Sequence, residues 1–146
     1  MDGFIGVEVG LLHGTDVVKR SIQALLRGAI VAGVFDAVHA GPPCSSFSRA
    51  RERGWHQRLR SVSLPHGLPG LSEKDSSLVK SGNACAKLAI SLANVAMHHG
   101  VPGSLENPAS SRMWMLPSFR RFLSRPGVRK YKSRRLLLRN GLEKAS

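Results

Sequence analysis

The chain has 146 residues, of which 42% are hydrophobic, and this is enough for one globular domain with a core of its own. It has no apolar run long enough to cross a membrane, and its first residues lack the basic and apolar regions of a secretory signal. Its 22 Lys and Arg residues outnumber 9 Asp and Glu, and the net charge of +13 is typical of proteins that bind phosphate groups. We therefore expect an intracellular, non-secreted protein with a nucleic-acid partner and no membrane.

The first half of the chain predicts two strands separated by a helix. Residues 4–12 are rich in β-branched and apolar residues, which favours a strand. Asp16 is typical of a helix start, and apolar residues then recur at helical spacing as far as Gly33. The short apolar segment 34–40 predicts a buried strand, and the polar segment 48–71 predicts a long loop, which is usually functional or disordered.

The second half continues this alternation. Ser72 and Asp75 form a plausible capping box for a helix that runs to about His99. Residues 101–107 predict another strand, and 117–123 a brief helix. The order of elements predicts an α/β domain over residues 1–125, with a parallel sheet and helices on both faces. Residues 126–146 form a basic C-terminal tail, read either as a strand or as a disordered segment.

Two reactive side chains follow successive predicted strands. Cys44 lies just past the end of the predicted strand 34–40, and Glu106 lies at the end of the next predicted strand. Parallel strands finish at one edge of a sheet, where open α/β sheets bind ligands, so we expect the two side chains to meet there. The ordinary structural interpretations are a small buried cysteine in a turn and an acid paired with an arginine. Cys44 and Cys85 form no Cys-x-x-Cys pair, the histidines show no ligand spacing, and we predict no metal.

The segments "GPPCSSFS" at 41–48 and "LENPASSRMW" at 105–114 resemble the motifs of the DNA (cytosine-5) methyltransferases. That family places a Pro-Cys nucleophile after one strand and a Glu-Asn pair after the next. The resemblance spans about residues 16–123 and implies a partial Rossmann-like sheet of the S-adenosylmethionine-dependent methyltransferase type. It implies that Cys44 adds to carbon 6 of cytosine before a methyl group is transferred to carbon 5, and that Glu106 contacts the N3 side of the base.

The same resemblance assigns substrate-side roles to residues near these two motifs. Two prolines would fix the approach of the nucleophile, an asparagine would hold its loop, and basic residues would favour the thiolate or bind an anion. For the serine, capping a turn is an equally weighted alternative to binding phosphate. The substrate-binding candidates are Pro42, Pro43, Ser46, Arg49, Arg51, Asn107 and Arg112. The loop 48–71 would match the mobile loop that closes on DNA in the family.

The cofactor half of the family pattern is not matched. The family has a Phe-x-Gly-x-Gly segment, whereas "FIGVEVG" at 4–10 has Glu8 where a glycine is wanted. Asp16 is the single candidate for a contact to S-adenosylmethionine, and a helix cap is the alternative. The chain is therefore interpreted as an N-terminally shortened or partial catalytic domain that a separate N-terminal methyltransferase segment would complement.

Three functions remain open from the sequence. The first is a transferase for DNA methylation, with S-adenosylmethionine as cofactor and a location in a compartment with DNA, the nucleus in a eukaryote. The second is a basic, non-catalytic remnant of such an enzyme that binds nucleic acid. The third is an unrelated cysteine hydrolase with a histidine base, which would leave the Glu-Asn-Pro segment unexplained.

Overall fold

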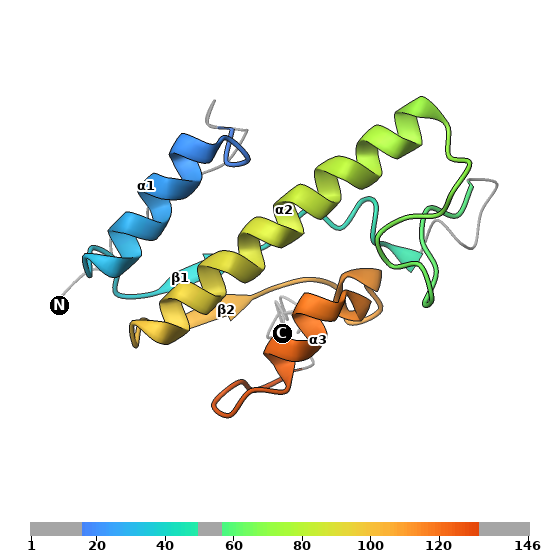
Figure 1. Ribbon diagram of the computed structural model, residues 1–146. Helices are drawn as coiled ribbons and strands as arrows, with labels where there is room; N and C mark the ends of the chain where they lie inside the picture. Colours follow the sequence, from blue (N-terminus) through green and yellow to red (C-terminus); the bar gives the residue numbers. More distant parts are fainter. Residues whose placement is uncertain (1–15, 50–56, 132–146) are drawn as a thin grey trace, which may run out of the picture.

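The computed structural model describes residues 16–49 and 57–131 (Figure 1). The described chain is mixed α/β. Its elements in chain order are α1 (Arg20–Val31), β1 (Val38–Ala40), α2 (Glu73–His98), β2 (Gly103–Leu105), the 3-10 helix η3 (Arg112–Met115) and α3 (Pro117–Leu123). The predicted strand 4–12 and most of the basic tail lie outside the described residues.

Hydrogen bonds and backbone conformation near the helix ends explain where α1 begins and where α2 begins and ends. The hydroxyl oxygen of Ser72 accepts a hydrogen bond from the backbone N–H of Asp75 at 3.1 Å, as the capping-box prediction requires. Gly100 follows α2 with a φ of 68°, a left-handed conformation that favours glycine and stops the helix. α1 begins four residues later than predicted, because Asp16 forms a turn in which its carboxylate accepts from the N–H of Val18.

The sheet consists of two short parallel strands beside the C-terminal half of α2 (Figure 1). Val38 is opposite Gly103, and Ala40 is opposite Leu105. Since side chains alternate across a strand, these four residues share the face that packs against α2. The other face carries exposed polar side chains, and within residues 16–49 and 57–131 we find no helix packed against it. The expected helices on both faces are thus seen on one face only.

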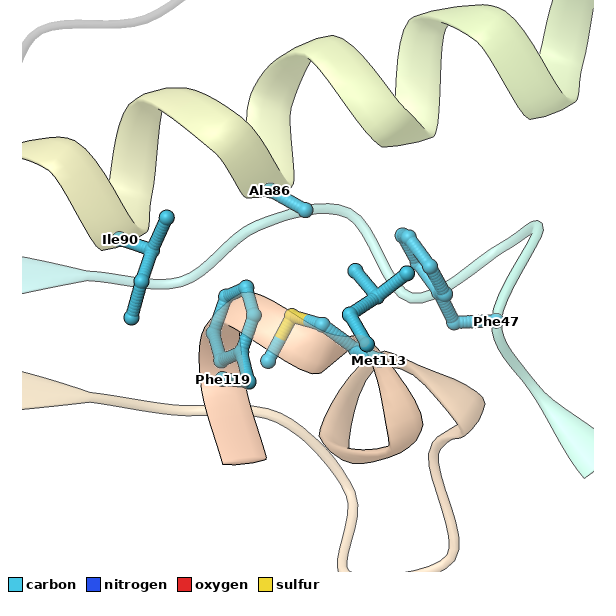
Figure 2. Close-up of a cluster of buried hydrophobic side chains, with 6 residues drawn as sticks. Phe47, Ala86, Ile90, Met113 and Phe119 are labelled. Carbon is cyan, nitrogen blue, oxygen red and sulfur yellow. The ribbon is translucent and has the colours of Figure 1, made fainter. Parts of the chain in front are cut away.

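α2 supplies the centre of the core because it is buried along two sides. One side packs α1 and β1 around a cluster of aliphatic side chains, Ile30, Leu88, Leu92 and Ala96. The other side packs against the segment after Cys44 and against η3 and α3 (Figure 2), in a cluster of Phe47, Ala86, Ile90, Met113, Leu116 and Phe119. This arrangement joins segments that are far apart in the sequence to one helix. Among the helices described, none is long and apolar enough to span a membrane.

Candidate functional site

The segments that follow β1 and β2 leave the sheet side by side. The N–H of Glu106 donates to the carbonyl of Ala40 at 2.9 Å, which extends the parallel pairing one step beyond the strands. The side-chain amide of Asn107 then donates to the carbonyl of Pro42 at 2.8 Å. Cys44 is exposed to solvent, as is Glu106. A thiol and a carboxyl thus follow adjacent strands at the carboxyl edge of the sheet, both open to a ligand.

The backbone around Cys44 is also held from its other side. The N–H of Phe47 donates to the carbonyl of Cys44 at 2.9 Å and closes a turn. The carbonyl of Phe47 accepts from the N–H of Arg112 at the same distance, and the ring of Phe47 is fully buried in the core (Figure 2). The turn therefore presents the thiol to solvent while its backbone is anchored in the core.

A buried arginine fastens this turn to α2. Arg60 is only 2% exposed, and its guanidinium donates to both the carbonyl and the hydroxyl oxygen of Ser46 at 3.0 Å. It also donates to the carbonyl of Val79 and the side-chain oxygen of Asn83, both on α2, and to the carbonyl of Pro65. One side chain therefore joins the cysteine turn, the long loop and the central helix.

Arg60 has no acidic partner among the residues that the structure describes. Its hydrogen-bond acceptors are neutral oxygens, and the guanidinium carbon lies 3.8 Å from the centre of the Phe47 ring. Burial lowers the pKa of Arg60 to about 10, so the group stays charged at neutral pH. The charge is held by directed hydrogen bonds and an aromatic face. The described part of the loop expected to be mobile, residues 57–71, is thereby fixed on α2.

The close contact between the cysteine turn and α2 depends on a glycine. A Cβ atom built on Gly82 would overlap the hydroxyl oxygen of Ser46 and would lie 3.2 Å from Arg60 and 3.3 Å from Phe47. No side chain fits at this position of the helix without displacing the turn. Gly82 and Arg60 are functional candidates that act on Cys44 through its backbone, and the sequence analysis missed both.

Glu106 has a different environment from Cys44. Its side chain is 80% exposed, and one carboxylate oxygen lies 3.7 Å from Nε2 of His39 on β1. The other ring nitrogen of His39 is 2.8 Å from the hydroxyl oxygen of Ser104, its neighbour across the sheet. His39 is not among the site residues that the sequence predicts. Strand alternation could have found it, because residue 39 faces the same side as residues 104 and 106 once the strands are in register.

The remaining predicted site residues differ in how far they are exposed to solvent. Pro42 is buried and its carbonyl is bonded to Asn107, whereas Pro43 is exposed to solvent beside Cys44. Ser46 is 3% exposed, and both its carbonyl and its hydroxyl oxygen accept hydrogen bonds from Arg60. Arg49 is exposed and Arg112 is half-buried, and both have interactions within the structure. Arg51 lies outside the described residues.

The second cysteine differs from the first. Cys85 lies within α2 and is half-buried, as its position in the helix predicts. Burial raises the pKa of its thiol, and the nearby carboxylate of Asp16 raises it further. Asp16 itself accepts a hydrogen bond within its own turn and does not cap α1, whose N-cap residue is Lys19. Cys85 is a poor nucleophile in this position, in contrast to the exposed Cys44.

Neither a metal centre nor a Cys-His pair is found within the described ranges. No group of three His, Cys, Asp or Glu side chains there is arranged to hold a metal ion. No hydrogen bond joins His39 to Cys44 in the same part of the chain. Comparison with protein-family models, curated proteins and solved structures gave no match to this chain. The functional argument therefore rests on the geometry of the edge of the sheet.

Proposed function

We propose that this chain is a DNA cytosine-5 methyltransferase-like protein in which Cys44 is the nucleophile and Glu106 the acidic partner. The observation that supports this proposal is the pairing of the two segments. Glu106 is bonded through its N–H to Ala40, and Asn107 is bonded to Pro42, so the acid and the thiol belong to adjoining loops on one edge. Both groups are exposed to solvent, and the proposal requires that a planar base bound at this edge contacts both.

The proposed first step is an addition to the pyrimidine ring. The thiolate of Cys44 forms a bond to carbon 6, and the electron pair of the carbon 5–carbon 6 double bond moves to carbon 5. The carboxyl of Glu106 shares or donates a proton at N3 and withdraws charge from the ring as the sulfur adds. Carbon 5 then has the character of an enamine carbon, which an activated methyl donor would alkylate. In duplex DNA the base must first leave the stack, because neither group reaches it inside the helix.

The roles of the supporting residues follow from their contacts. Arg60 and Asn107 hold the turn on both sides of Cys44, so little backbone entropy is lost when the thiol meets the ring. The exposed arginines, with the net charge of +13, would attract the phosphate backbone.

S-adenosylmethionine would supply the methyl group in this reaction. Among the described residues, Asp16 is the one acid that the family resemblance assigns to the cofactor, and its carboxylate is used in its own turn. This part of the chain therefore does not fit the cofactor, and our proposal covers the nucleophile and the acid alone.

A covalent trap tests the proposal. The full chain is incubated with S-adenosylmethionine and a DNA duplex in which cytosine is replaced by 5-fluorocytosine, whose fluorine blocks release of the enzyme. We expect a covalent protein–DNA adduct that Cys44→Ser abolishes. Cys85→Ser is the matched control and retains the adduct, because the Cys85 thiol is half-buried in α2.

Three outcomes are informative. An adduct that depends on Cys44 but not on Cys85 supports the proposal. A folded chain that gives no adduct, alone or with a separate N-terminal methyltransferase segment, argues against catalysis. If that chain still binds DNA with a steep salt dependence, the second function, a basic nucleic-acid-binding protein, is favoured instead by the same net charge.

A further inference from the structure

A second polar feature is found where α3 meets the C-terminal half of α2, and none of its lining residues belongs to the candidate site described above. A pocket of about 250 Å³ is lined there by Asn94, Ser118, Arg121, Phe122 and Arg125. It has room for several water molecules of about 30 Å³ each, and so for a phosphate group with part of its hydration shell. Apart from the ring of Phe122, the side chains of this lining are polar or positively charged.

One arginine of this pocket is held in a fixed orientation. The side-chain oxygen of Asn94 accepts from Nη1 of Arg125 at 2.6 Å. The amide nitrogen of Asn94 is in turn bonded to the carbonyl of Ile90 at 2.7 Å, which fixes the side chain of Asn94 on α2. The ring of Phe122 lies 6.0 Å from the guanidinium carbon of Arg125. The bond to Asn94 uses one N–H group of the Arg125 guanidinium, so its other N–H groups are available to a ligand.

The lining of the pocket within the described residues has two arginines and no acidic side chain. Arg121 lies on α3 and Arg125 lies just beyond its end, and both side chains line the same pocket. The ion pair found among the described residues, between His39 and Glu106, involves neither of them. Arginines are favoured near the end of a helix by its dipole, but α3 has only seven residues and its dipole is small. Arginine side chains that line one pocket are well suited to binding phosphate, because the guanidinium group can donate two parallel hydrogen bonds to its oxygens.

We propose that this pocket binds a phosphodiester group of a nucleic-acid backbone, with Arg121 and Arg125 as the charged donors and Ser118 as a neutral donor. This inference does not depend on methyl transfer, because a phosphate contact positions a nucleic acid whether or not chemistry follows. The proposal gives two of the basic residues, Arg121 and Arg125, a specific role in binding nucleic acid.

Salt-dependent binding tests the proposal. The affinity of the full chain for a fluorescein-labelled single-stranded DNA and for the matching duplex is measured by anisotropy between low and physiological salt. We expect Arg121→Gln and Arg125→Gln each to weaken binding and to reduce the slope of log K against log salt by about 0.7 to 0.9. Arg20→Gln, at an exposed position on α1, removes the same charge and should leave that slope nearly unchanged.

A charge-neutral variant separates the pocket from a general basic surface. Asn94→Ala removes the bond that orients Arg125 but leaves the net charge unchanged, and we expect it to weaken binding several-fold with little change in slope. Thermal melting of each variant checks that the fold is kept. The proposal is overturned if Arg20→Gln changes the slope as much as the pocket variants do. It is also overturned if inorganic phosphate protects the pocket arginines from phenylglyoxal while DNA does not.

Discussion

The two loops at the carboxyl edge of the sheet are held in opposite ways. The turn that carries Cys44 is anchored through its backbone by Arg60, Asn107 and a fully buried Phe47. Glu106 shares the backbone pairing of the edge, but its side chain is 80% exposed and has one long contact to His39. A nucleophile benefits from a fixed position before substrate arrives, whereas an acid that contacts the base can be ordered by the base itself. The difference suits the proposed reaction and can be tested residue by residue.

The largest effect is expected at Arg60. Arg60→Ala leaves a cavity and removes the partners of Ser46, Val79 and Asn83, so the free energy of unfolding should fall by about 3–5 kcal/mol. Urea denaturation measures this change. Arg58→Ala is the control, since Arg58 is exposed and its replacement should stay within about 0.5 kcal/mol. Equal losses for the two variants would show that the buried network does not hold the turn.

Replacing Gly82 by alanine should have the next largest effect on the free energy of unfolding. The change should destabilise the fold, whereas Gly→Ala inside a helix ordinarily stabilises it. Gly82→Ala places a methyl group against the hydroxyl oxygen of Ser46, and we expect a loss of about 1–3 kcal/mol from overpacking. Gly28→Ala on α1 meets no atom within 4 Å and should gain about 0.5–1 kcal/mol from helix propensity.

A second substitution checks the cause of the Gly82 effect. Combining Gly82→Ala with Ser46→Gly removes the atom that overlaps, so part of the lost stability should return. If Gly82→Ala is instead as favourable as Gly28→Ala in urea denaturation, the close contact between the turn and α2 does not exist in solution.

The features that the sequence predicted well are local ones. The cap of α2 at Ser72 and its end at Gly100 need only neighbouring residues, and both are found. The strands are shorter than predicted, because a strand ends where its partner ends. Residues 34–40 are apolar, but only Val38–Ala40 pair with β2. Local propensity does not contain this information.

The features that the sequence did not predict depend on contacts between distant segments. Arg60 and Arg58 stand two residues apart in one polar loop, and no pattern shows that one is buried and the other exposed. Gly82 is inside a helix, where a glycine only lowers the expected stability until the turn at Ser46 is placed against it. The candidate site was thus predictable in its reactive groups, which follow strands, but not in the residues that hold them.

The two cysteines should differ in reactivity by about tenfold or more. Cys44 is exposed on its turn, whereas Cys85 is half-buried and its pKa is raised by burial and by Asp16. Alkylation by iodoacetamide at pH 8, followed by mass spectrometry in Cys44→Ser and Cys85→Ser variants, measures the two rates. The raised pKa also makes Cys85 stabilise the fold below the ordinary thiol pKa, and this contribution is lost as the pH rises through the folded-state value. Similar rates for the two thiols would contradict the exposure of the turn.

Asn107 should have a smaller effect on stability, because it contributes one bond between the loops. Asn107→Ala removes the donor to the carbonyl of Pro42 and should cost about 1 kcal/mol in urea denaturation. Asn107→Asp places a carboxylate against that carbonyl, so it should be more harmful at neutral pH than at pH 3. A variant without any loss would show that the two loops are not joined by this bond.

The smallest effect on stability is expected at Glu106 and His39. These residues test most directly the difference between the anchored cysteine turn and the exposed acid. The contact of 3.7 Å between Glu106 and His39 is exposed, and such pairs contribute about 0–1 kcal/mol. Glu106→Gln and His39→Gln should therefore leave urea denaturation almost unchanged, while Glu106→Gln should greatly reduce adduct formation with 5-fluorocytosine DNA because the proton donor at N3 is weakened. A residue that contributes little to folding but much to the adduct acts on the substrate. If Glu106→Gln destabilised the chain as much as Arg60→Ala, the acid would belong to the framework, and the contrast between the two loops would be lost.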